Sequence, residues 1–586
     1  MQDHRSTDMT DTDSQGPRWN TMQWQWLGIA VAGALAAGLG LWGHWIYFQS
    51  QGNPGGILDA IYLTFQLFTF KFAGEPGPKP WSLEVARFLA PAVTSYALIW
   101  ALLRVLGQRW QLWRLKGHVV ICGLGRKGVF LAKNHLRSGK RVVIIEADEG
   151  NDWIEVCRGL GAVVLNGDAA DEDMLRQARV NSASRLIAVC KRDAVNIEIA
   201  RLAHALVAKG RAHSLGPLQC LIHIVNLKWC ASFRSLGVFD GAAAAFAPST
   251  FNFFENSARA LFNEHPLDRE LIRPEDPRQV HLVVVDCNNM AEALVAQAIR
   301  VAHFANIMRP RITVIDPRAD MAQARFFAQF PQAMRAADLE FMTGTAQDPA
   351  IRQDLVTWAE DCKRMVTVAI CTQDETAAME TALTLPAELR ERGIPVCVRL
   401  ADETGIAGVL ERARQTLGLY HFGTIPDGCQ IGDDLDRQAR AFHEVYLAQA
   451  RHDGKAVGQD AALLPWEELD AGFKDSNRQL ADHIGAKLRA IGCVAVPAKD
   501  APGGADFAFT VEEVEILAKM EHARWCADRF MAGWKLGTAD KPRKISPFFI
   551  PYDQLEEKIK EYDRVAVRNI PKVLWVHAGL GIKRLQ

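Results

Sequence analysis

A long stretch without formal charge near the start of the sequence restricts the possible folds more than any other feature. No Asp, Glu, Lys or Arg occurs from Thr21 to Gln51, and the part from Trp26 to Phe48 is almost wholly apolar. A helix needs about 20 such residues to cross the hydrocarbon core of a bilayer. Tryptophans stand near both ends of the stretch, as interfacial aromatic residues do. We therefore expect a transmembrane helix, preceded by a polar, disordered tail over residues 1–20.

A second apolar stretch runs from about Leu83 to Leu106. It is weaker than the first, because Glu84 and Arg87 lie in its first turn, where their spacing allows them to pair. Basic residues cluster after it, and the positive-inside rule places that end in the cytoplasm. We expect two transmembrane helices within residues 21–116, with both chain termini on the cytoplasmic side of a prokaryotic inner or plasma membrane. A plain two-helix anchor is the alternative to a pore.

The segment between the two apolar stretches, Ile57–Pro76, is apolar and helical in pattern but too short to cross the bilayer with its flanks. Such a segment is tolerated at membrane depth only when other protein surrounds it, so it predicts a re-entrant pore helix. Its Asp59-Ala-Ile-Tyr62 start and its Gly-acid-x-Pro end resemble the pore region of two-span potassium channels.

The predicted filter departs from that family. Potassium channels carry a Thr-Val-Gly-Tyr-Gly filter whose carbonyl oxygens replace the hydration shell of the ion, whereas this chain has Thr69, Phe70, Lys71 and Phe72 at the corresponding place. The resemblance implies a homotetramer in the lipid bilayer with a permeating ion. Four Lys71 side chains around the tetramer axis would repel cations, so we expect weak potassium selectivity. Alternatively, Lys71 extends to the extracellular interface.

The charge balance and the cysteines argue against two other classes of function. The chain has 67 Lys and Arg residues against 68 Asp and Glu residues, so no basic excess favours nucleic acid as a partner. Its 12 cysteines are scattered, with no CxxC pair and no Cys/His cluster. We therefore expect no nucleic-acid partner and no metal site, and we interpret the cysteines as small buried side chains in a reducing cytosol.

A glycine-rich loop follows the second apolar stretch, in the run HVVICGLGRKG from His118 to Gly128. A β-branched strand precedes its glycines, a helical pattern follows them, and the next strand ends in an acid, Glu146, 18 residues past Gly128. In a dinucleotide fold, backbone amides at this helix N-terminus bind phosphate and the acid binds a ribose hydroxyl. A glycine turn that serves only helix packing is the alternative. The candidate cofactor-binding residues are Gly123, Leu124, Gly125, Arg126, Lys127, Gly128, Glu146, Ala147, Asp168 and Ala169.

The series of strands and loops from about Gly117 to Ala247 resembles the nucleotide-binding domain of Trk-type potassium-uptake regulators, also called the regulator-of-potassium-conductance domain. We assign residues 117–260 to this domain. The resemblance implies that its ligand is NAD or an adenine nucleotide, ATP or ADP.

The same order of strands recurs within residues 275–425, which indicates a duplication. The matching segments are His281–Asp286, Arg311–Asp316, Phe341–Asp348, Met365–Ile370 and Val396–Arg399. The second copy has lost its glycines, because Cys287-Asn-Asn replaces the loop. We therefore expect this degenerate copy to be structural, or to bind something other than a dinucleotide.

Residues 435–586 are helical and aromatic in pattern and contain an internal repeat, in which Pro465–Arg478 recurs as Pro551–Arg564. The pattern from Glu515 to Lys558 resembles the ryanodine-receptor repeat (RyR) domain. Its aromatic and basic side chains suit a planar anionic ligand, such as a nucleotide-derived signal. The candidate pocket residues are Arg478, His522, Trp525, Trp534 and Tyr552. Alternatively, Glu521 and His522 form a buried helix-packing pair.

Together these segments predict a membrane α-helical pore unit, a duplicated α/β Rossmann-like region and a mainly α C-terminal domain. We expect a nucleotide ligand to act on the cytosolic domains and to gate the pore, with potassium or another monovalent ion as the permeating ion. No set of nucleophile, base and orienting group is visible, so we expect no catalytic residues and no enzyme. Two alternatives stay open: a membrane-tethered NAD-dependent oxidoreductase, and a stress or defence effector that depolarises the membrane when a nucleotide signal binds.

Overall fold

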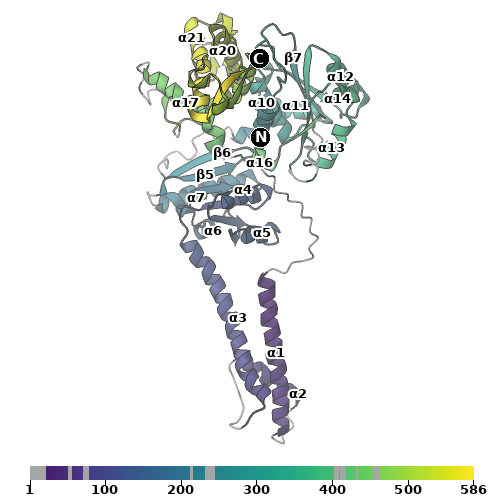
Figure 1. Ribbon diagram of the computed structural model, residues 1–586, viewed down its shortest axis with the longest axis vertical. Coiled ribbons are helices and arrows are strands. Elements are labelled where there is room, and N and C mark those ends of the chain that lie inside the picture. The colour runs from purple at the N-terminus through teal and green to yellow at the C-terminus, as the bar shows by residue number, and fades with distance from the viewer. Residues whose placement is uncertain are drawn as a thin grey trace. The chain divides into compact units, whose positions relative to one another are not determined.

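The computed structural model describes residues 21–50, 56–69, 78–211, 215–230, 245–401, 418–430, 433–452, 461–466 and 468–585, with the isolated positions 405, 408, 454 and 456. The chain divides into two compact units, one that ends at Arg114 and one that begins at Leu115. Figure 1 shows the long helices of the first unit and the sheets and helices of the second.

Three helices form the N-terminal unit: α1 (Thr21–Ser50), α2 (Ile57–Phe68) and α3 (Trp81–Trp113). α1 and α3 pack along each other, with a tryptophan pair near each end of their contact. The ring centroids of Trp26 and Trp100 lie 5.4 Å apart, and those of Trp42 and Trp81 lie 5.7 Å apart. The two helices are therefore held together by edge-to-face aromatic contacts as well as by apolar packing.

Small residues of α1 allow α2 to pack closely. A Cβ added at Gly40 would lie 2.8 Å from Cγ2 of Thr64, so only glycine permits this approach. Thr64 also places its Oγ1 3.2 Å from Nδ1 of His44. Such contacts through small and hydroxyl-bearing residues are typical of helix packing in membranes. The remaining face of α2 leaves Leu58, Tyr62 and Phe65 exposed, which suits a surface covered by lipid or by further protein.

Within the described residues, one helix is both long and apolar enough to cross a bilayer, over Trp26–Ser50 of α1. The predicted second span corresponds to α3, and its crossing of the membrane stays a prediction. The predicted ion pair in its first turn is confirmed, with Nη1 of Arg87 3.2 Å from Oε1 of Glu84. Of the predicted filter residues, Thr69 caps the C-terminal end of α2, whereas 70–72 lie outside the described residues.

The second unit begins with a six-stranded parallel sheet, in the spatial order β3-β2-β1-β4-β5-β6. Its strands are β1 (Val119–Cys122), β2 (Val142–Glu146), β3 (Val163–Asn166), β4 (Arg185–Ala188), β5 (Leu218–His223) and β6 (Phe246–Phe251). Its helices are α4 (Arg126–Arg137), α5 (Trp153–Gly159), α6 (Glu172–Gln177) and α7 (Asp193–Gly210). This is the strand order of a doubly wound dinucleotide fold, so the predicted Rossmann-like fold of this region is confirmed.

A second parallel sheet repeats the first, with the order β12-β11-β10-β7-β8-β9. Its strands are β7 (Gln279–Val285), β8 (Arg311–Asp316), β9 (Asp338–Thr343), β10 (Arg364–Ile370), β11 (Val396–Arg399) and β12 (Leu419–Phe422). Its helices are α10 (Asn289–Val301), α11 (Ala319–Gln329), α12 (Pro349–Glu360), α13 (Glu375–Thr384), α14 (Ala387–Glu391) and α16 (Ile425–Gly428). Since β7 to β12 follow the order of β1 to β6, the predicted duplication is confirmed. The connecting helix α9 (Phe253–Glu264) packs against α10 and α16.

The C-terminal domain is mainly helical, as predicted. Its helices are α17 (Asp433–His452), α18 (Ala471–Asp482), α19 (Ile484–Ala490), α20 (Val511–Met531), α21 (Glu557–Arg568) and α22 (Ile570–Val573). The strands β13 (Cys493–Pro497) and β16 (Leu580–Arg584) pair with each other, as do β14 (Lys535–Leu536) and β15 (Ile545–Ser546).

Two bidentate ion pairs join the C-terminal domain to the Rossmann pair. Nε of Arg259, on α9, lies 2.7 Å from Oδ2 of Asp482, and both side chains are buried. Nη2 of Arg489, on α19, lies 2.7 Å from Oδ1 of the buried Asp268. α10 also packs directly against α20. The two ion pairs and this helix contact hold the domain at a defined position on α9 and α10.

Candidate functional site

The glycine loop lies where the strand order of the first sheet reverses, between the carboxyl ends of β1 and β4. Gly123 has a φ of +98°, which side chains rarely adopt, and a Cβ there would lie 3.1 Å from the backbone of Cys190. A Cβ on Gly128 would lie 2.0 Å from the carbonyl oxygen of Gly123. These two glycines therefore let the loop turn tightly and let α4 pack against it, as the dinucleotide fold requires.

Gly125 has a different role from its neighbours. It is the N-cap residue of α4, has extended backbone and offers no side chain to the first turn of the helix. A Cβ built on it would meet no other atom within 4 Å, so the space in front of the helix is open. The amides of the first turn and the helix dipole point at this space, which is the arrangement that binds phosphate.

A cavity of about 730 Å³ covers the loop. Nine of the ten predicted cofactor-binding residues line it: Gly123, Leu124, Gly125, Arg126, Lys127, Glu146, Ala147, Asp168 and Ala169. The tenth, Gly128, is buried behind the loop, where it makes the close contact with Gly123. The structure thus brings together residues from the ends of β1, β2 and β3 that lie far apart in the sequence.

Glu146, the last residue of β2, accepts a hydrogen bond from the backbone of the glycine loop. Its Oε2 accepts a hydrogen bond from the amide of Leu124 at 2.5 Å, and its Oε1 accepts one from the amide of Asp148 at 2.9 Å. Asn151 adds a bond from Nδ2 to the carbonyl oxygen of Leu124 at 3.1 Å. The carboxylate is therefore fixed at the cavity wall, at the position where an acid binds a ribose hydroxyl in this fold.

Basic side chains outnumber acidic ones around the cavity. The cations are Arg126, Lys127, Lys191, Arg192 and Arg399, and the acids are Glu146, Asp148 and Asp168. Lys127 places its Nζ 3.1 Å from Nε2 of His223 and 5.2 Å from the centre of the Phe253 ring. Burial lowers the pKa of the Lys127 ammonium. The excess of positive charge suits a ligand that carries two or more phosphate charges.

Several lining residues were not predicted from the sequence. Three of them directly follow β4: Cys190, Lys191 and Arg192. In open α/β sheets, ligands bind beyond the carboxyl ends of the strands where the strand order reverses, so the position of β4 could have predicted these residues. Phe253 and Phe254 come from α9, and Arg399 comes from β11 of the second copy. No motif marks these three positions, because only the packing of the two copies brings them to the cavity.

The second copy fills the corresponding space with its own side chains. Asn288 is the N-cap of α10, and its Oδ1 accepts hydrogen bonds from the amides of Met290 and Ala291. Its Nδ2 donates to the carbonyl oxygen of Cys371 at 2.5 Å. Asp316 retains the role of Glu146, accepting a bond from the amide of Cys287 at 2.8 Å. The amides that face open space in the first copy are thus already satisfied in the second.

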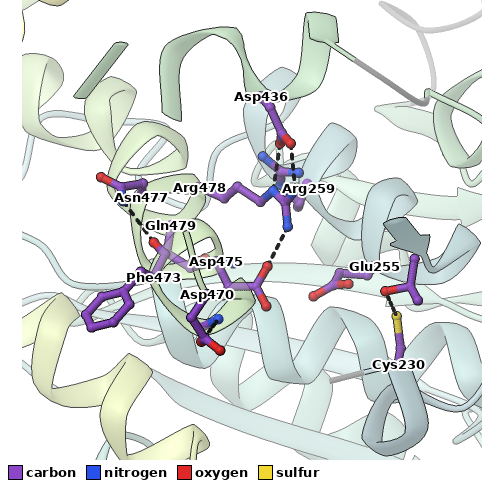
Figure 2. Close-up of polar contacts among 12 residues, drawn as sticks. Cys230, Glu255, Arg259, Asp436, Asp470, Phe473, Asp475, Asn477, Arg478 and Gln479 are labelled. Atoms are coloured by element: carbon purple, nitrogen blue, oxygen red, sulfur yellow. Dashed lines mark hydrogen bonds and ion pairs between the residues drawn. The ribbon is translucent and has the colours of Figure 1, made fainter. Parts of the chain in front are cut away.

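A second cavity, of about 720 Å³, lies in the C-terminal domain between α17, α20 and α21. His522 and Trp525, both predicted pocket residues, line it together with Phe442, Tyr446 and Tyr562. The other three predicted residues are not part of its lining, although the Tyr552 ring lies 6.0 Å from that of His522. Tyr552 is buried and donates to Glu515 at 3.0 Å, and the Trp534 ring lies 5.7 Å from the Arg529 guanidinium. Nη2 of Arg478 lies 2.6 Å from Oδ2 of Asp436, a pair drawn in Figure 2, and both residues line a separate polar cavity.

The internal repeat of the C-terminal domain gives two histidines similar contacts, and one of them, His522, lines this cavity. On α20, Nε2 of His522 lies 2.9 Å from the carbonyl oxygen of Ile550, and on α17, Nε2 of His443 lies 2.7 Å from that of Leu464. Burial alone would lower the pKa of His522, but the Asp563 carboxylate, 3.4 Å from its Nδ1, and a contact with Cys526 raise it to about 10. The cavity therefore presents a charged imidazole beside carboxylate groups.

Comparisons with known proteins match two parts of the chain to domain families. Residues 119–214 match the TrkA-N domain, and residues 510–583 match the RyR domain. Both resemblances inferred from sequence motifs are thus confirmed at the level of the domain. Potassium channel protein 1 of Methanocaldococcus jannaschii is 33% identical over 86 residues, which are 15% of this chain and 26% of that protein. The chain therefore spans about a quarter of the curated relative that it matches.

Solved structures with a similar course of the chain include two of the GsuK channel. One, described as bound to ADP, is 13% identical, covers 70% of this chain and 96% of its own, and has a TM-score of 0.35. Another, described as bound to NAD, is 11% identical, covers 85% and 90%, and has a TM-score of 0.35. The gating ring of human SLO3 is 12% identical, covers 53% and 81%, and has a TM-score of 0.36. The glycine loop of the first copy lies within residues 119–214, the segment that matches the TrkA-N domain.

Proposed function

We propose that this chain is a nucleotide-regulated, potassium-channel-like membrane protein. The observation that carries the proposal is the open, uncapped N-terminus of α4 under a cavity with five cationic side chains, in a chain that also has a membrane-length helix. The match of this region to the TrkA-N domain and the potassium-channel relative support the same reading.

The proposed ligand is NAD or an adenine nucleotide such as ADP or ATP. Its phosphates would face the amides at the start of α4, and its ribose would face Glu146. NAD and ADP appear in the descriptions of the GsuK structures, and both carry the pyrophosphate that the positive charge of the cavity favours. In the second copy, Asn288 occupies the equivalent amides, which supports one nucleotide site in each chain.

The proposed membrane part is a homotetramer of two-span subunits, in which α1 and α3 cross the bilayer and α2 is re-entrant. The apolar packing of α2 against both long helices and its exposed aromatic face support this arrangement. Both termini would then lie in the cytoplasm with the nucleotide-binding domains. A nucleotide opens or closes such a pore only if it binds one of the two states more tightly than the other.

A flux measurement on the full-length protein tests this proposal. The purified chain is reconstituted into liposomes with a potassium gradient, and ion flux is recorded with ADP, ATP, NAD or no nucleotide. We expect at least one nucleotide to change the flux in the wild-type protein, and the same change in a Gly125→Ala variant to need at least about tenfold more nucleotide. Nucleotide binding without flux under any condition would contradict the pore, and turnover of bound NAD with added substrates would instead support a tethered oxidoreductase.

The cavity of the C-terminal domain supports a second ligand-sensing site. Its aromatic wall suits a planar ligand, as predicted from the sequence. Its charged lining, however, includes Glu521, Glu561 and Asp563 against Lys558 and His522. Glu521 is paired with the buried Lys487 and Arg524, so the remaining charges of the lining balance. This composition favours a neutral planar group over the anionic ligand predicted from the sequence. Binding of dye-labelled purine bases and of nucleoside monophosphates, compared in a Trp525→Ala variant, would separate the two chemistries.

A further inference from the structure

The second Rossmann copy contributes one cationic side chain to the cavity of the first. Arg399 is the last residue of β11 and lines the cavity over the glycine loop. The carboxyl ends of β1, β2 and β4 line the same cavity. The copy that has lost its own phosphate loop therefore still reaches the phosphate site of its neighbour.

Two adjacent aromatic rings hold cations from the two copies next to each other. The Arg399 guanidinium lies 5.7 Å from the centre of the Phe254 ring, and the Lys127 ammonium lies 5.2 Å from the centre of the Phe253 ring. The two rings themselves are 5.5 Å apart, in the first turn of α9. Because Lys127 belongs to the glycine loop, Arg399 stands beside the residues that face a bound phosphate.

The guanidinium of Arg399 has few polar contacts with the residues that the structure describes, so it could bind an anion in the cavity. Its Nη1 donates to the carbonyl oxygen of Cys371 at 3.4 Å, which is a long and weak hydrogen bond. Within the described part of the chain, no ion pair is formed by this guanidinium. Burial lowers the pKa of Arg399, although the charge of the nearby Glu375 carboxylate raises it. Glu375 forms no ion pair with this guanidinium among the described residues and accepts the amide of Ala401, so an anion that entered the cavity would be its first direct ion-pair partner.

We propose that Arg399, supplied by the degenerate second copy, binds a phosphate of the nucleotide held on the glycine loop of the first copy. This inference rests on the proposed function, because it concerns the same nucleotide. Binding then joins the two copies through the ligand, so the degenerate copy senses occupancy although it binds no nucleotide of its own. A guanidinium suits this position because its planar set of donors matches phosphate oxygens.

If Arg399 binds a phosphate, its removal should weaken the binding of ADP but not that of adenosine, which has the same base and no phosphate. Calorimetry on the full-length protein would compare adenosine and ADP in the wild type, in Arg399→Ala and in Arg399→Lys. Arg390→Ala is the control, because Arg390 is an exposed arginine on α14 of the same copy. We expect Arg399→Ala to weaken ADP binding by roughly 10- to 100-fold, the loss of one charge-assisted hydrogen bond. Adenosine affinity should stay unchanged, and Arg399→Lys should recover part of the loss.

Hydrogen exchange provides a readout of the connection between the copies. In the wild type, ADP should protect amides at the end of β11 and in the first turn of α9 as well as those of the glycine loop. In Arg399→Ala, saturating ADP should protect the loop alone. This comparison also shows that the variant is folded, because its protection without ADP should match the wild type.

The outcomes separate this inference from the proposed function. A wild-type protein that binds neither ADP nor NAD would overturn the proposed function. A wild type that binds ADP, with unchanged ADP affinity in Arg399→Ala, would overturn the role of Arg399 alone. Equal losses of ADP and adenosine binding in that variant would likewise overturn it, because they would show a general loss of the site.

Discussion

Gly125 and Gly128 differ in what an added methyl group would meet, so substitution by alanine should affect the stability of the protein differently at the two positions. Gly125 has φ −75° and ψ −177°, which alanine adopts without strain, and no atom lies within 4 Å of the position that the methyl group would take. Alanine is a poorer N-cap than glycine by roughly 0.5–1 kcal/mol but gains about 0.4–1 kcal/mol through the unfolded state. We expect Gly125→Ala to leave the free energy of unfolding nearly unchanged.

The affinity for nucleotide, unlike the stability, should fall in Gly125→Ala. The methyl of Gly125→Ala would stand where a phosphate approaches the amides of α4, and the loss of one charge-assisted contact weakens binding by about tenfold or more. At Gly128, the methyl would lie 2.0 Å from the carbonyl oxygen of Gly123. The resulting overpacking should destabilise Gly128→Ala by about 1–3 kcal/mol.

Thermal unfolding and calorimetry with ADP check both glycine variants in one set of samples. We expect a stable Gly125→Ala protein with weakened ADP binding and a destabilised Gly128→Ala protein. ADP binding by Gly125→Ala as tight as that of the wild type would refute a phosphate site at the start of α4. Equal losses of stability in the two variants would show that the loop does not have the geometry described above.

Four further predictions concern other residues. Glu146→Ala should weaken nucleotide binding by about 1–3 kcal/mol for a lost hydrogen bond to a charged group, as measured by calorimetry; unchanged affinity would remove Glu146 from the site. The binding stoichiometry should be one nucleotide per chain because Asn288 caps the second loop, and a value of two would contradict that assignment. Lys71→Glu should raise the permeability to cations, measured as a change of the reversal potential in a potassium and sodium gradient. A wild-type reversal potential near the potassium equilibrium potential would contradict our interpretation of the filter. Burial alone would lower the pKa of His522, but Asp563 and Cys526 together raise it to about 10. Protonated His522 and these partners therefore stabilise the C-terminal domain fully below pH about 6.5, and this contribution is lost as the pH rises through about 10. Melting temperatures from pH 7 to 10 should therefore fall in the wild type and change less in His522→Gln, and parallel curves would argue against the pair.

The parts of the site that depend on local sequence could be predicted. A β-branched strand, three glycines and an acid at the end of the next strand determine the loop between β1 and α4, because each of these residues acts within one βαβ unit. The second sheet could be predicted for the same reason, since the order of its strands repeats that of the first. Nine of the ten predicted residues line one cavity because they all belong to these local units.

The parts that depend on packing between units could not be predicted. In the sequence, Arg399 is an ordinary residue at the end of a strand. Its place at the cavity of the first copy depends on how the two copies pack. Trp534 and Tyr552 belong to the same motif as His522 and Trp525, but the domain directs their side chains to other contacts. Arg478 is also directed away, into the ion pairs with Asp436 and Asp475. A motif shows that residues belong to one domain, and only the fold determines which of them share a surface.

The ion pairs between Arg259 and Asp482 and between Arg489 and Asp268 have a consequence for how the chain unfolds. Removing one partner of a buried pair leaves a charge without compensation, which costs about 3–5 kcal/mol. Replacing Asp482 or Asp268 would leave its arginine without a partner in this way, whereas separating the C-terminal domain would return these charges to water and expose the apolar residues that α10 and α20 bury between them. Buried residues of both Rossmann copies and of the C-terminal domain belong to one continuous hydrophobic core, so we expect them to unfold as one cooperative unit. Truncation before α17 should accordingly yield a destabilised remainder, and limited proteolysis should release no stable C-terminal fragment.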